Sequence, residues 1–270
     1  MRYTLTSLFM LLCTVLHAQE HSALLLVHYG TTFADTRAKT IDAINQKAKQ
    51  AFPHLAVCEA YASPIVTKRL AQRGEQKALP LDALLRLRAD GHRRIVVQPT
   101  FVIDGKEMAQ LRNDIEQVRP FFDDITLGTP LLHSVDDARR LCTILANRHP
   151  ANASQREHVV FVGHGTQGPA TALYSQLDYM LHAEGHTLCH VATIEGYPTL
   201  QTLIASLKAQ QAHSVTLVPL LFVAGNHANA DIAGEWRQTL EHEGFAVNVC
   251  LEGLGEVPAI QELYIEKARR

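Results

Sequence analysis

The stretch VVFVGHGTQG, residues 159–168, is an apolar run that passes directly into a glycine-rich turn. A short apolar run bounded by glycine is typical of a strand buried on both faces of a parallel sheet. Gly163, Gly165 and Gly168 fit the letter pattern of a dinucleotide-binding loop. His164 stands between two of these glycines. The turn therefore has two interpretations: a loop that binds phosphate, or a strand end that presents an imidazole.

The sequence around this stretch alternates between apolar runs and helical patterns. ALLLVHYG (23–30) and RRIVVQPTFV (93–102) are further apolar runs, and residues 34–52 between them have helical spacing. SVDDARRLCTILANRH (134–149) also has helical spacing, with Ser134 as its N-cap. Apolar runs that alternate with amphipathic helices predict an α/β fold, with a parallel sheet covered on both faces.

The second half of the chain repeats the layout of the first. Three pairs of stretches match in order: LLLVHYGTT (24–32) with VVFVGHGTQ (159–167), EAYASPIVTKRL (59–70) with TIEGYPTLQTLI (193–204), and RRIVVQPTFVIDGKE (93–107) with HSVTLVPLLFVAGNH (213–227). The repeat predicts two similar lobes, 19–150 and 151–270, divided at the polar stretch NRHPANASQRE. A ligand cleft is then expected where the loops after the strands converge.

The two copies differ at three strand-end loops. His164 falls opposite Tyr29, Glu195 opposite Tyr61, and His227 opposite Lys106. Two imidazoles and a carboxylate form a ligand set suited to a divalent transition metal. Since the carboxyl ends of parallel strands meet at one edge of a sheet, we expect His164, Glu195 and His227 to converge on one metal ion.

Two other interpretations of the GHG turn are weaker. A dinucleotide loop requires an acidic residue about twenty positions further on, after a second strand. Glu184 is near that distance but lies at the end of a predicted helix, and the first-half counterpart HYGTT lacks the glycines. No nucleotide cofactor is therefore expected. If His164 stood alone, the interpretation as a polar turn residue would be favoured. Glu195 and His227 at matching strand ends favour a metal site instead.

The first eighteen residues, MRYTLTSLFMLLCTVLHA, have the layout of a secretory signal peptide. Arg2 precedes an apolar run from Leu8 to Leu16, and the small Ala18 follows. The run is too short to span a bilayer, so no stable membrane span is expected. We therefore predict a signal peptide at 1–18, a mature chain that begins near Gln19, and a periplasmic location. A buried N-terminal strand or helix is the alternative.

Composition narrows the class of protein. Apolar residues make up 47% and charged residues 19%, which indicates a soluble globular protein. The net charge is −2 and no long basic run occurs, so nucleic-acid binding is not expected. None of the cysteines beyond the signal-like segment lies in a CxxC pair, which argues against a thiolate zinc site. These residues are expected to be lone buried thiols, although an exported protein can oxidise them.

Several stretches resemble one enzyme family, the anaerobic sirohydrochlorin cobaltochelatases within the class II, ferrochelatase-like chelatases. The matching stretches are LLLVHYGT, VVFVGHGT, IEGYP, LVPLLFVAGNHANADI and LEGLGEVPAI, from residue 24 to about 260. The resemblance implies two flavodoxin-like lobes with a tetrapyrrole in the cleft between them. It places the family's metal ligands on His164, Glu195 and His227, and a further acidic residue on Glu107. The chain departs from cytoplasmic relatives at VHYGT, where they carry serine and phenylalanine before the glycine.

The sequence and this resemblance together predict a chelatase that inserts a divalent metal ion into sirohydrochlorin or a related tetrapyrrole. The metal is a substrate, with Co²⁺ foremost and Fe²⁺ or Ni²⁺ as alternatives. His164 and Glu195 are expected to be catalytic. Contacts with the tetrapyrrole are expected from Tyr29, Gly30, Thr31, Glu107, Gly165 and Thr166. A periplasmic carrier of tetrapyrrole or metal that performs no turnover is the alternative function, and a homo-oligomer is left open.

Overall fold

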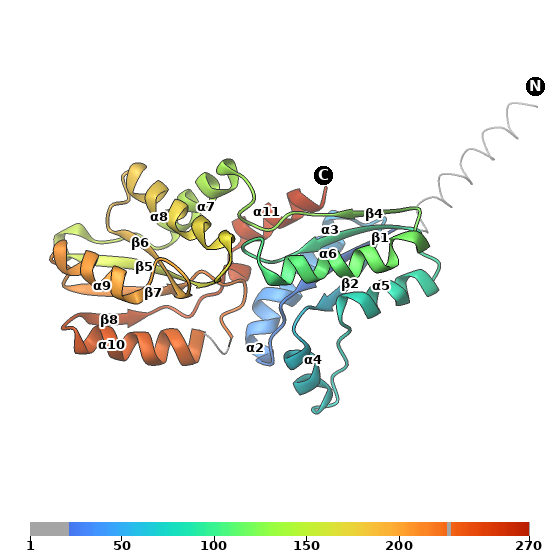
Figure 1. Ribbon diagram of the computed structural model, residues 1–270, viewed down its shortest axis with the longest axis horizontal. Helices are drawn as coiled ribbons and strands as arrows, with labels where there is room; N and C mark the ends of the chain where they lie inside the picture. The colour runs from blue at the N-terminus through green and yellow to red at the C-terminus, as the bar shows by residue number, and fades with distance from the viewer. Residues whose placement is uncertain (1–21, 226–227, 270) are drawn as a thin grey trace, which may run out of the picture.

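The computed structural model describes residues 22–225 and 228–269, and it contains two four-stranded parallel sheets with the same strand order (Figure 1). The first sheet has the order β2-β1-β3-β4, with β1 Ser22–His28, β2 Ala56–Tyr61, β3 Arg94–Pro99 and β4 Asp124–Leu127. The second has the order β6-β5-β7-β8, with β5 Glu157–Gly165, β6 Cys189–Glu195, β7 Ser214–Pro219 and β8 Ala246–Val249. The prediction of two similar parallel-sheet lobes is confirmed.

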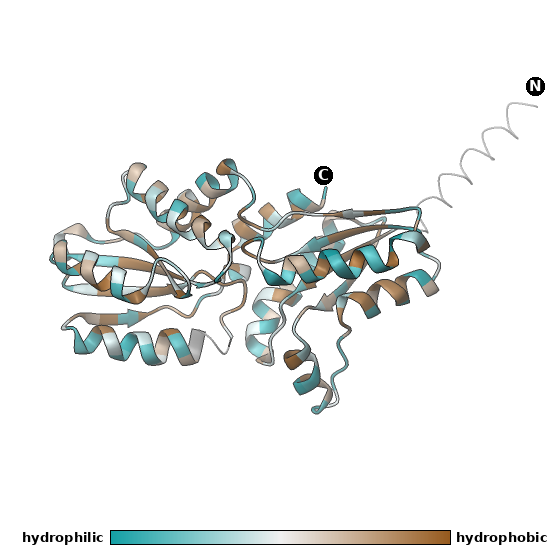
Figure 2. Cartoon of the chain, viewed as in Figure 1, coloured by the Kyte–Doolittle hydropathy of each residue, from teal (hydrophilic) through white to brown (hydrophobic). Residues whose placement is uncertain are grey.

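Helices cover both faces of each sheet. In the first lobe, α5 (Pro80–Ala89) and α6 (Lys106–Val118) bury one face, and α3 (Ala43–Ala51) packs on the other. In the second lobe, α9 (Leu200–Ala209) and α10 (Arg237–His242) bury one face, and α8 (Ala172–Ala183) packs on the other. Two short helices, α2 (Ala34–Arg37) and α4 (Pro64–Ala71), flank the loops after β1 and β2. Figure 2 shows the strands as the mostly apolar layer and polar residues along the outer helices.

The two lobes exchange a helix. α7 (Val135–Arg148) precedes residue 150 but packs on α8 of the second lobe. α11 (Pro258–Ala268) ends the chain but packs on α3 and β3 of the first lobe, where Tyr264 Oη donates to the carbonyls of Thr100 and Phe101, both at 3.1 Å (Figure 1). One apolar core therefore runs through both lobes, from Leu24 in β1 to Phe161 in β5. The division near residue 150 stays a prediction about domains, and this exchange is a feature that it did not include.

Local signals in the sequence explain how α7 begins. Ser134 Oγ accepts a hydrogen bond from the Asp137 amide at 3.1 Å, and the Asp137 carboxylate accepts one from the Ser134 amide at 3.0 Å. This reciprocal cap satisfies two amides that the first turn leaves unpaired, and it confirms Ser134 as the N-cap. Within the described ranges, no helix is long and apolar enough to cross a membrane. The cysteines there, Cys58, Cys142, Cys189 and Cys250, are free thiols.

The registers of the two sheets define which residues are equivalent. In the first lobe Val27 pairs with Pro99 and His28 with Tyr61, and in the second Val162 pairs with Pro219 and Gly163 with Thr193. His164 is therefore the counterpart of Tyr29, as predicted. The counterpart of Glu195 is Ser63, so the prediction that it falls opposite Tyr61 is wrong. The comparison of sequences had aligned the prolines that follow, but the second-lobe turn reaches its proline two residues later.

The same registers correct the third pair of loops. Pro99 and Pro219 occupy equivalent positions, so the two loops are related by a constant shift in numbering. That shift makes Glu107, and not Lys106, the counterpart of position 227 in the sequence. The first copy therefore does carry one acidic residue at a matching strand-end loop.

Candidate functional site

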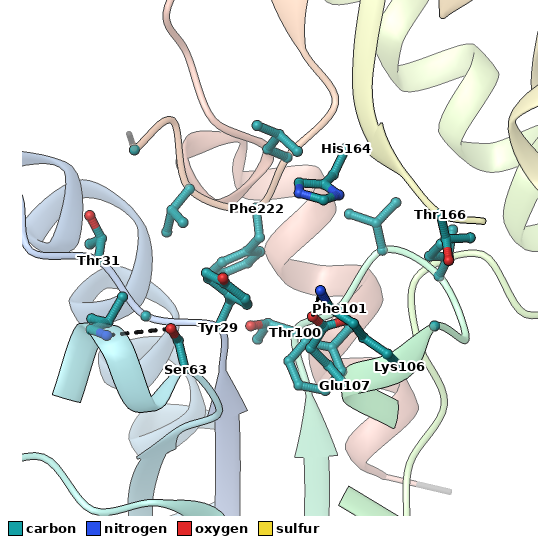
Figure 3. Close-up of a pocket in the computed structure, with 18 of the residues that line it drawn as sticks. Tyr29, Thr31, Ser63, Thr100, Phe101, Lys106, Glu107, His164, Thr166 and Phe222 are labelled. Atoms are coloured by element: carbon teal, nitrogen blue, oxygen red, sulfur yellow. Dashed lines mark hydrogen bonds and ion pairs between the residues drawn. The ribbon is translucent and has the colours of Figure 1, made fainter. Parts of the chain in front are cut away.

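A cavity of about 530 Å³ lies between the two lobes, at the carboxyl ends of the strands. Its walls include all but one of the predicted site residues: Tyr29, Gly30, Thr31, Glu107, His164, Gly165, Thr166 and Glu195. The remaining one, His227, lies outside the described residues. Figure 3 shows Tyr29, Thr31 and Glu107 from the first lobe and His164 and Thr166 from the second around one hollow. Residues far apart in the sequence therefore meet at this edge of both sheets.

His164 lies next to the last residue of β5, and its imidazole is half-buried in the cavity wall. Nδ1 lies 3.2 Å from the carbonyl oxygen of Gly165. A neutral imidazole that donates from Nδ1 carries its lone pair on Nε2. A hydrogen bond of this kind fixes the tautomer and orientation of metal-binding histidines. His164 is thus arranged to offer Nε2 to a metal ion or a proton.

Gly165 allows the ends of β5 and β6 to pack closely together. The two residues Gly165 and Glu195 pair across β5 and β6, and a Cβ atom on Gly165 would lie 1.7 Å from the Glu195 carbonyl oxygen. Gly165 also has φ of +80°, which side-chain-bearing residues rarely adopt. The glycine that suggested a phosphate loop is required here by the close approach of two strand ends. As a result an imidazole and a carboxylate stand on neighbouring strands at the cavity wall.

The first-lobe wall repeats this turn without a histidine. Gly30 has φ of +98°, and a Cβ atom there would lie 2.5 Å from the Tyr61 ring. Tyr29, the counterpart of His164, keeps 40% of its surface exposed and lines the cavity. Glu107 lies half-buried in the first turn of α6, with one carboxylate oxygen 3.9 Å from Lys106 Nζ. This wall therefore combines an aromatic ring with one acidic group.

A buried histidine stands behind the first-lobe wall, and the sequence analysis did not assign it a role. The His28 ring is fully buried, with Nδ1 3.0 Å from Thr100 Oγ1 and Nε2 3.1 Å from Asn45 Oδ1. Asn45 Nδ2 in turn donates to Glu59 Oε2 at 2.7 Å, and Lys77 pairs with Glu59. Burial lowers the pKa of His28 to about 4, so the ring is neutral at pH 7.

This chain of contacts fixes the orientation of a cavity-lining hydroxyl. Because the Asn45 oxygen must accept, His28 donates from Nε2 and accepts at Nδ1 from the Thr100 hydroxyl, whose contact with the Val27 carbonyl oxygen is longer, at 3.4 Å. Thr100 lines the cavity. The departure from the resembled family at VHYGT is the signal in the sequence that could have identified this position.

The rest of the cavity lining is largely apolar and includes a few polar groups. The apolar side chains are Phe33, Ile65, Val66, Phe101, Val102, Ile103, Leu220, Leu221, Phe222 and Val223. Ser63, Thr100 and Gln167 add hydroxyl and amide groups, and the exposed Arg69 and Lys106 add positive charge. A largely apolar cavity with exposed cations on its wall suits an apolar molecule that also carries carboxylates.

Comparisons with known proteins point to one family. A family model described as cobalt chelatase (CbiK) matches residues 22–270. The chain is 35% identical over 248 residues to the sirohydrochlorin cobaltochelatase of Salmonella typhimurium, covering 90% of this chain and 93% of the relative. It is 30% identical over 234 residues to the sirohydrochlorin cobaltochelatase CbiKC of Nitratidesulfovibrio vulgaris, covering 84% of this chain and 82% of the relative.

Solved structures with the same fold include SirB from Bacillus subtilis with Fe³⁺. Its TM-score is 0.66 at 16% sequence identity, and the match covers 92% of this chain and 94% of that chain. A second similar structure is CbiX, described as the terminal enzyme for biosynthesis of siroheme in denitrifying bacteria, with a TM-score of 0.55 at 15% identity and coverage of 92% and 98%. At these identities the likeness concerns the fold, and it agrees with the two-lobed arrangement of parallel sheets.

Proposed function

The chain belongs to the cobalt chelatase (CbiK) family, and from that premise we propose that it inserts a divalent metal ion into sirohydrochlorin or a related tetrapyrrole. The metal is a substrate that enters the cavity and leaves in the product. Co²⁺ is the first candidate, because the two relatives compared above are named cobaltochelatases. Fe²⁺ and Ni²⁺ suit the same donor set.

The observation that carries this proposal is the pairing of Gly165 with Glu195, which sets His164 and Glu195 on neighbouring strand ends at the wall of an apolar cavity. A tetrapyrrole must lose two pyrrole protons as it accepts a divalent ion. His164, oriented by the Gly165 carbonyl, can hold the ion through Nε2 or accept one of these protons. Glu195 supplies negative charge for the ion and can pass a proton outward. His227 completes the ligand set that we propose from the family resemblance.

The first-lobe wall and the turns are proposed to hold the tetrapyrrole. Tyr29 offers a ring face at the cavity wall, and Thr31 and Thr166 offer hydroxyl groups next to Gly30 and Gly165. Substrate carboxylates are the groups that such donors recognise. Glu107 lies on the first-lobe side of the cavity as an additional acceptor for a proton or a ligand for the incoming ion.

The test of this function is incubation of the purified protein with sirohydrochlorin and Co²⁺ or Fe²⁺, followed by absorbance over time. Many equivalents of metallated product per chain are expected. His164→Ala should lower the insertion rate about 10²–10⁴-fold, because a ligand and a proton acceptor are lost together. His213→Ala, an exposed histidine outside the cavity, is the control. No more than one bound equivalent per chain, or an unchanged rate in a folded His164→Ala variant, would favour the carrier function instead.

The location of the chain is a separate proposal. The signal-like layout of residues 1–18 supports export to the periplasm and a mature chain that begins near Gln19. Mass spectrometry of the native protein from fractionated cells tests this. A chain that retains Met1 in the cytoplasmic fraction would contradict it.

A further inference from the structure

Three side chains of the second lobe that do not line the cavity come together as a second set of metal ligands. Asp178 and His182 lie one turn apart on α8, and His190 lies on the neighbouring strand β6. One ligand atom from each lies within 4.8 Å of the others. We propose that Asp178, His182 and His190 bind one divalent transition-metal ion, at a site separate from the cavity.

Each of the three groups uses one atom in a contact with the protein and has a second ligand atom as well. His182 Nε2 lies 2.8 Å from the Cys189 carbonyl oxygen, so it donates there and its lone pair is on Nδ1. Asp178 Oδ1 accepts from the Val191 amide at 2.7 Å, which leaves Oδ2. Hydrogen bonds from a ligand to a carbonyl or an amide are the usual outer contacts of metal sites, where they fix ligand orientation.

His190 has an outer contact as well. Its Nε2 lies 2.9 Å from His158 Nδ1, and the two rings stack with centroids 5.1 Å apart. When His190 donates to His158, its lone pair is on Nδ1. Both rings are buried, with 2% of His190 and 1% of His158 exposed. An imidazole with one nitrogen held by a neighbouring group is a common arrangement among metal-binding histidines.

Charge is the second reason to place a cation here. Asp178 is partly buried. Of the ion pairs formed among the described residues, none involves Asp178. A partly buried carboxylate without a cationic partner is costly, and a bound dication would offset that cost. The site therefore has the donor atoms for an ion and also a charge for it to balance.

In a second cluster of candidate ligands, the carboxylate already has a cationic partner. Ligand atoms of His149, Cys250 and Glu252 also lie within 4.8 Å of one another. However, Arg148 donates to both carboxylate oxygens of Glu252, with Nε at 3.0 Å from one of them. The guanidinium already supplies the positive charge there. The comparison favours the Asp178 cluster as the one that takes a metal ion.

The proposed ion would not be the ion that enters the tetrapyrrole. His158 is near the start of β5 and His164 near its end, and six residues of a strand span about 20 Å. The cluster is therefore at the opposite end of the sheet from the cavity. Two imidazoles and one carboxylate with open positions suit Co²⁺, Ni²⁺ or Zn²⁺ better than Mg²⁺ or Ca²⁺. Asp178 and His182 are only half-buried, which leaves the ion a route from solvent.

Equilibrium dialysis of the untagged protein against Co²⁺ tests the proposal. The measurement is made in a His164→Ala background, in order to reduce the amount of Co²⁺ that the cavity binds. Asp178→Asn keeps the shape of the side chain and the oxygen that accepts from Val191 but removes the charge. One bound equivalent per chain should be lost in this double variant at a Co²⁺ concentration that saturates the His164→Ala protein. His213→Ala, an exposed histidine of the same lobe, should keep that equivalent.

His182→Gln is the second variant, because it removes an imidazole from a half-buried position and not from the core. It should also lose the equivalent, and the visible absorption of protein-bound Co²⁺ should disappear with it. His158→Gln, which changes only an outer contact, should weaken Co²⁺ binding about 10–100-fold. The proposal would be overturned if the His164→Ala protein bound the same number of Co²⁺ ions, with the same affinity, after Asp178→Asn or His182→Gln was added. The absence of any such equivalent in the His164→Ala protein with Co²⁺, Ni²⁺ and Zn²⁺ alike would overturn it as well.

Discussion

At the scale of single residues, Gly165 links the backbone of the turn to the chemistry of the cavity. Its φ of +80° and its contact with the Glu195 carbonyl leave no room for a side chain. The close packing of the two strand ends places His164 and Glu195 on neighbouring strands at the cavity wall. A substitution at Gly165 should therefore disturb the proposed metal ligands without touching either of them.

Gly165→Ala should lower the free energy of unfolding by at least about 1–3 kcal/mol, the cost of a strained backbone position. The insertion rate should fall as well, because the Cβ atom would push the Glu195 strand end away. Urea unfolding and the insertion assay measure the two effects. Gly168→Ala is the matched control, since a Cβ atom there meets only Thr166 Oγ1 at 3.6 Å and φ is not positive. Equal stability and rate in both variants would contradict this account of Gly165.

His28 makes the protein sensitive to acid. Its pKa is about 4 in the folded chain and near 6.5 when unfolded, so the unfolded state binds the proton more readily between these values. Stability should therefore fall as pH drops below about 6.5 and level off below about 4, by roughly 3 kcal/mol from this group. Glu59 and Lys77 are the charged groups near the ring; the carboxylate opposes the shift and the ammonium adds to it.

The measurement is the free energy of unfolding in urea at pH 7 and pH 4 for the wild type and His28→Asn. The variant should lose less stability over this range, by roughly 3 kcal/mol, whatever its stability at pH 7. Asn replacement of the exposed His213 should leave the pH dependence of the wild type unchanged. An equal loss in wild type and His28→Asn would show that the buried ring is not the group that titrates.

At the scale of elements, α11 stabilises the fold through a buried ion pair with α7. Lys267 Nζ lies 2.8 Å from Asp137 Oδ1, with 5% and 10% of the two side chains exposed. Asp137 also closes the cap of α7, so the same carboxylate serves two elements. Lys267→Met would leave it buried beside an apolar side chain. The cost of removing one partner of a buried pair is about 3–5 kcal/mol.

Arg269, the C-cap residue of α11, is the matched control for Lys267. Its pair with Glu262 spans 3.7 Å and is exposed, with 52% and 41% of the two side chains accessible. Arg269→Ala should therefore change the free energy of unfolding by less than about 1 kcal/mol. Thermal and urea unfolding of the two variants compare the pairs directly. A Lys267→Met variant no less stable than Arg269→Ala would mean that the buried pair adds nothing to the fold.

The sequence predicted those features that depend on short stretches of chain. Alternating apolar runs and helical spacing gave the two sheets, and the strand-end rule placed His164 and Glu195 at one cavity. Features that depend on packing between distant segments were not predicted. The contact between Gly165 and Glu195 depends on the register between β5 and β6. The Asp178 cluster forms only because α8 packs against β6. The counterpart of Glu195 was misplaced because the turn after β6 is two residues longer than the turn after β2. No sequence pattern marks this difference in length.

At the scale of the whole molecule, the exchange of α7 and α11 makes each lobe depend on the other half of the chain. A first-lobe fragment ending at residue 150 lacks α11, whose Ile260, Leu263 and Tyr264 are buried. The fragment from 151 lacks α7, whose Leu141 and Leu145 are buried in the same core as α8. Leaving this apolar surface in water removes a stabilisation of about 1.5–3 kcal/mol for each large side chain.

Each half expressed alone should therefore be less stable than the intact chain, while the two halves mixed should reassociate through the exchanged helices. The stabilisation lost from the buried side chains of the missing helix is comparable to the net stability of an ordinary domain. Cooperative unfolding of the separate halves should therefore be lost or strongly weakened. Calorimetry of each half, of the mixture and of the intact protein measures this. A matched pair divided instead at residue 130, before α7, should give a more stable second-lobe fragment, because it regains α7. If the two halves divided at 150 each melted cooperatively at the temperature of the intact chain, the lobes would be independent domains and the exchanged helices would be peripheral to their stability.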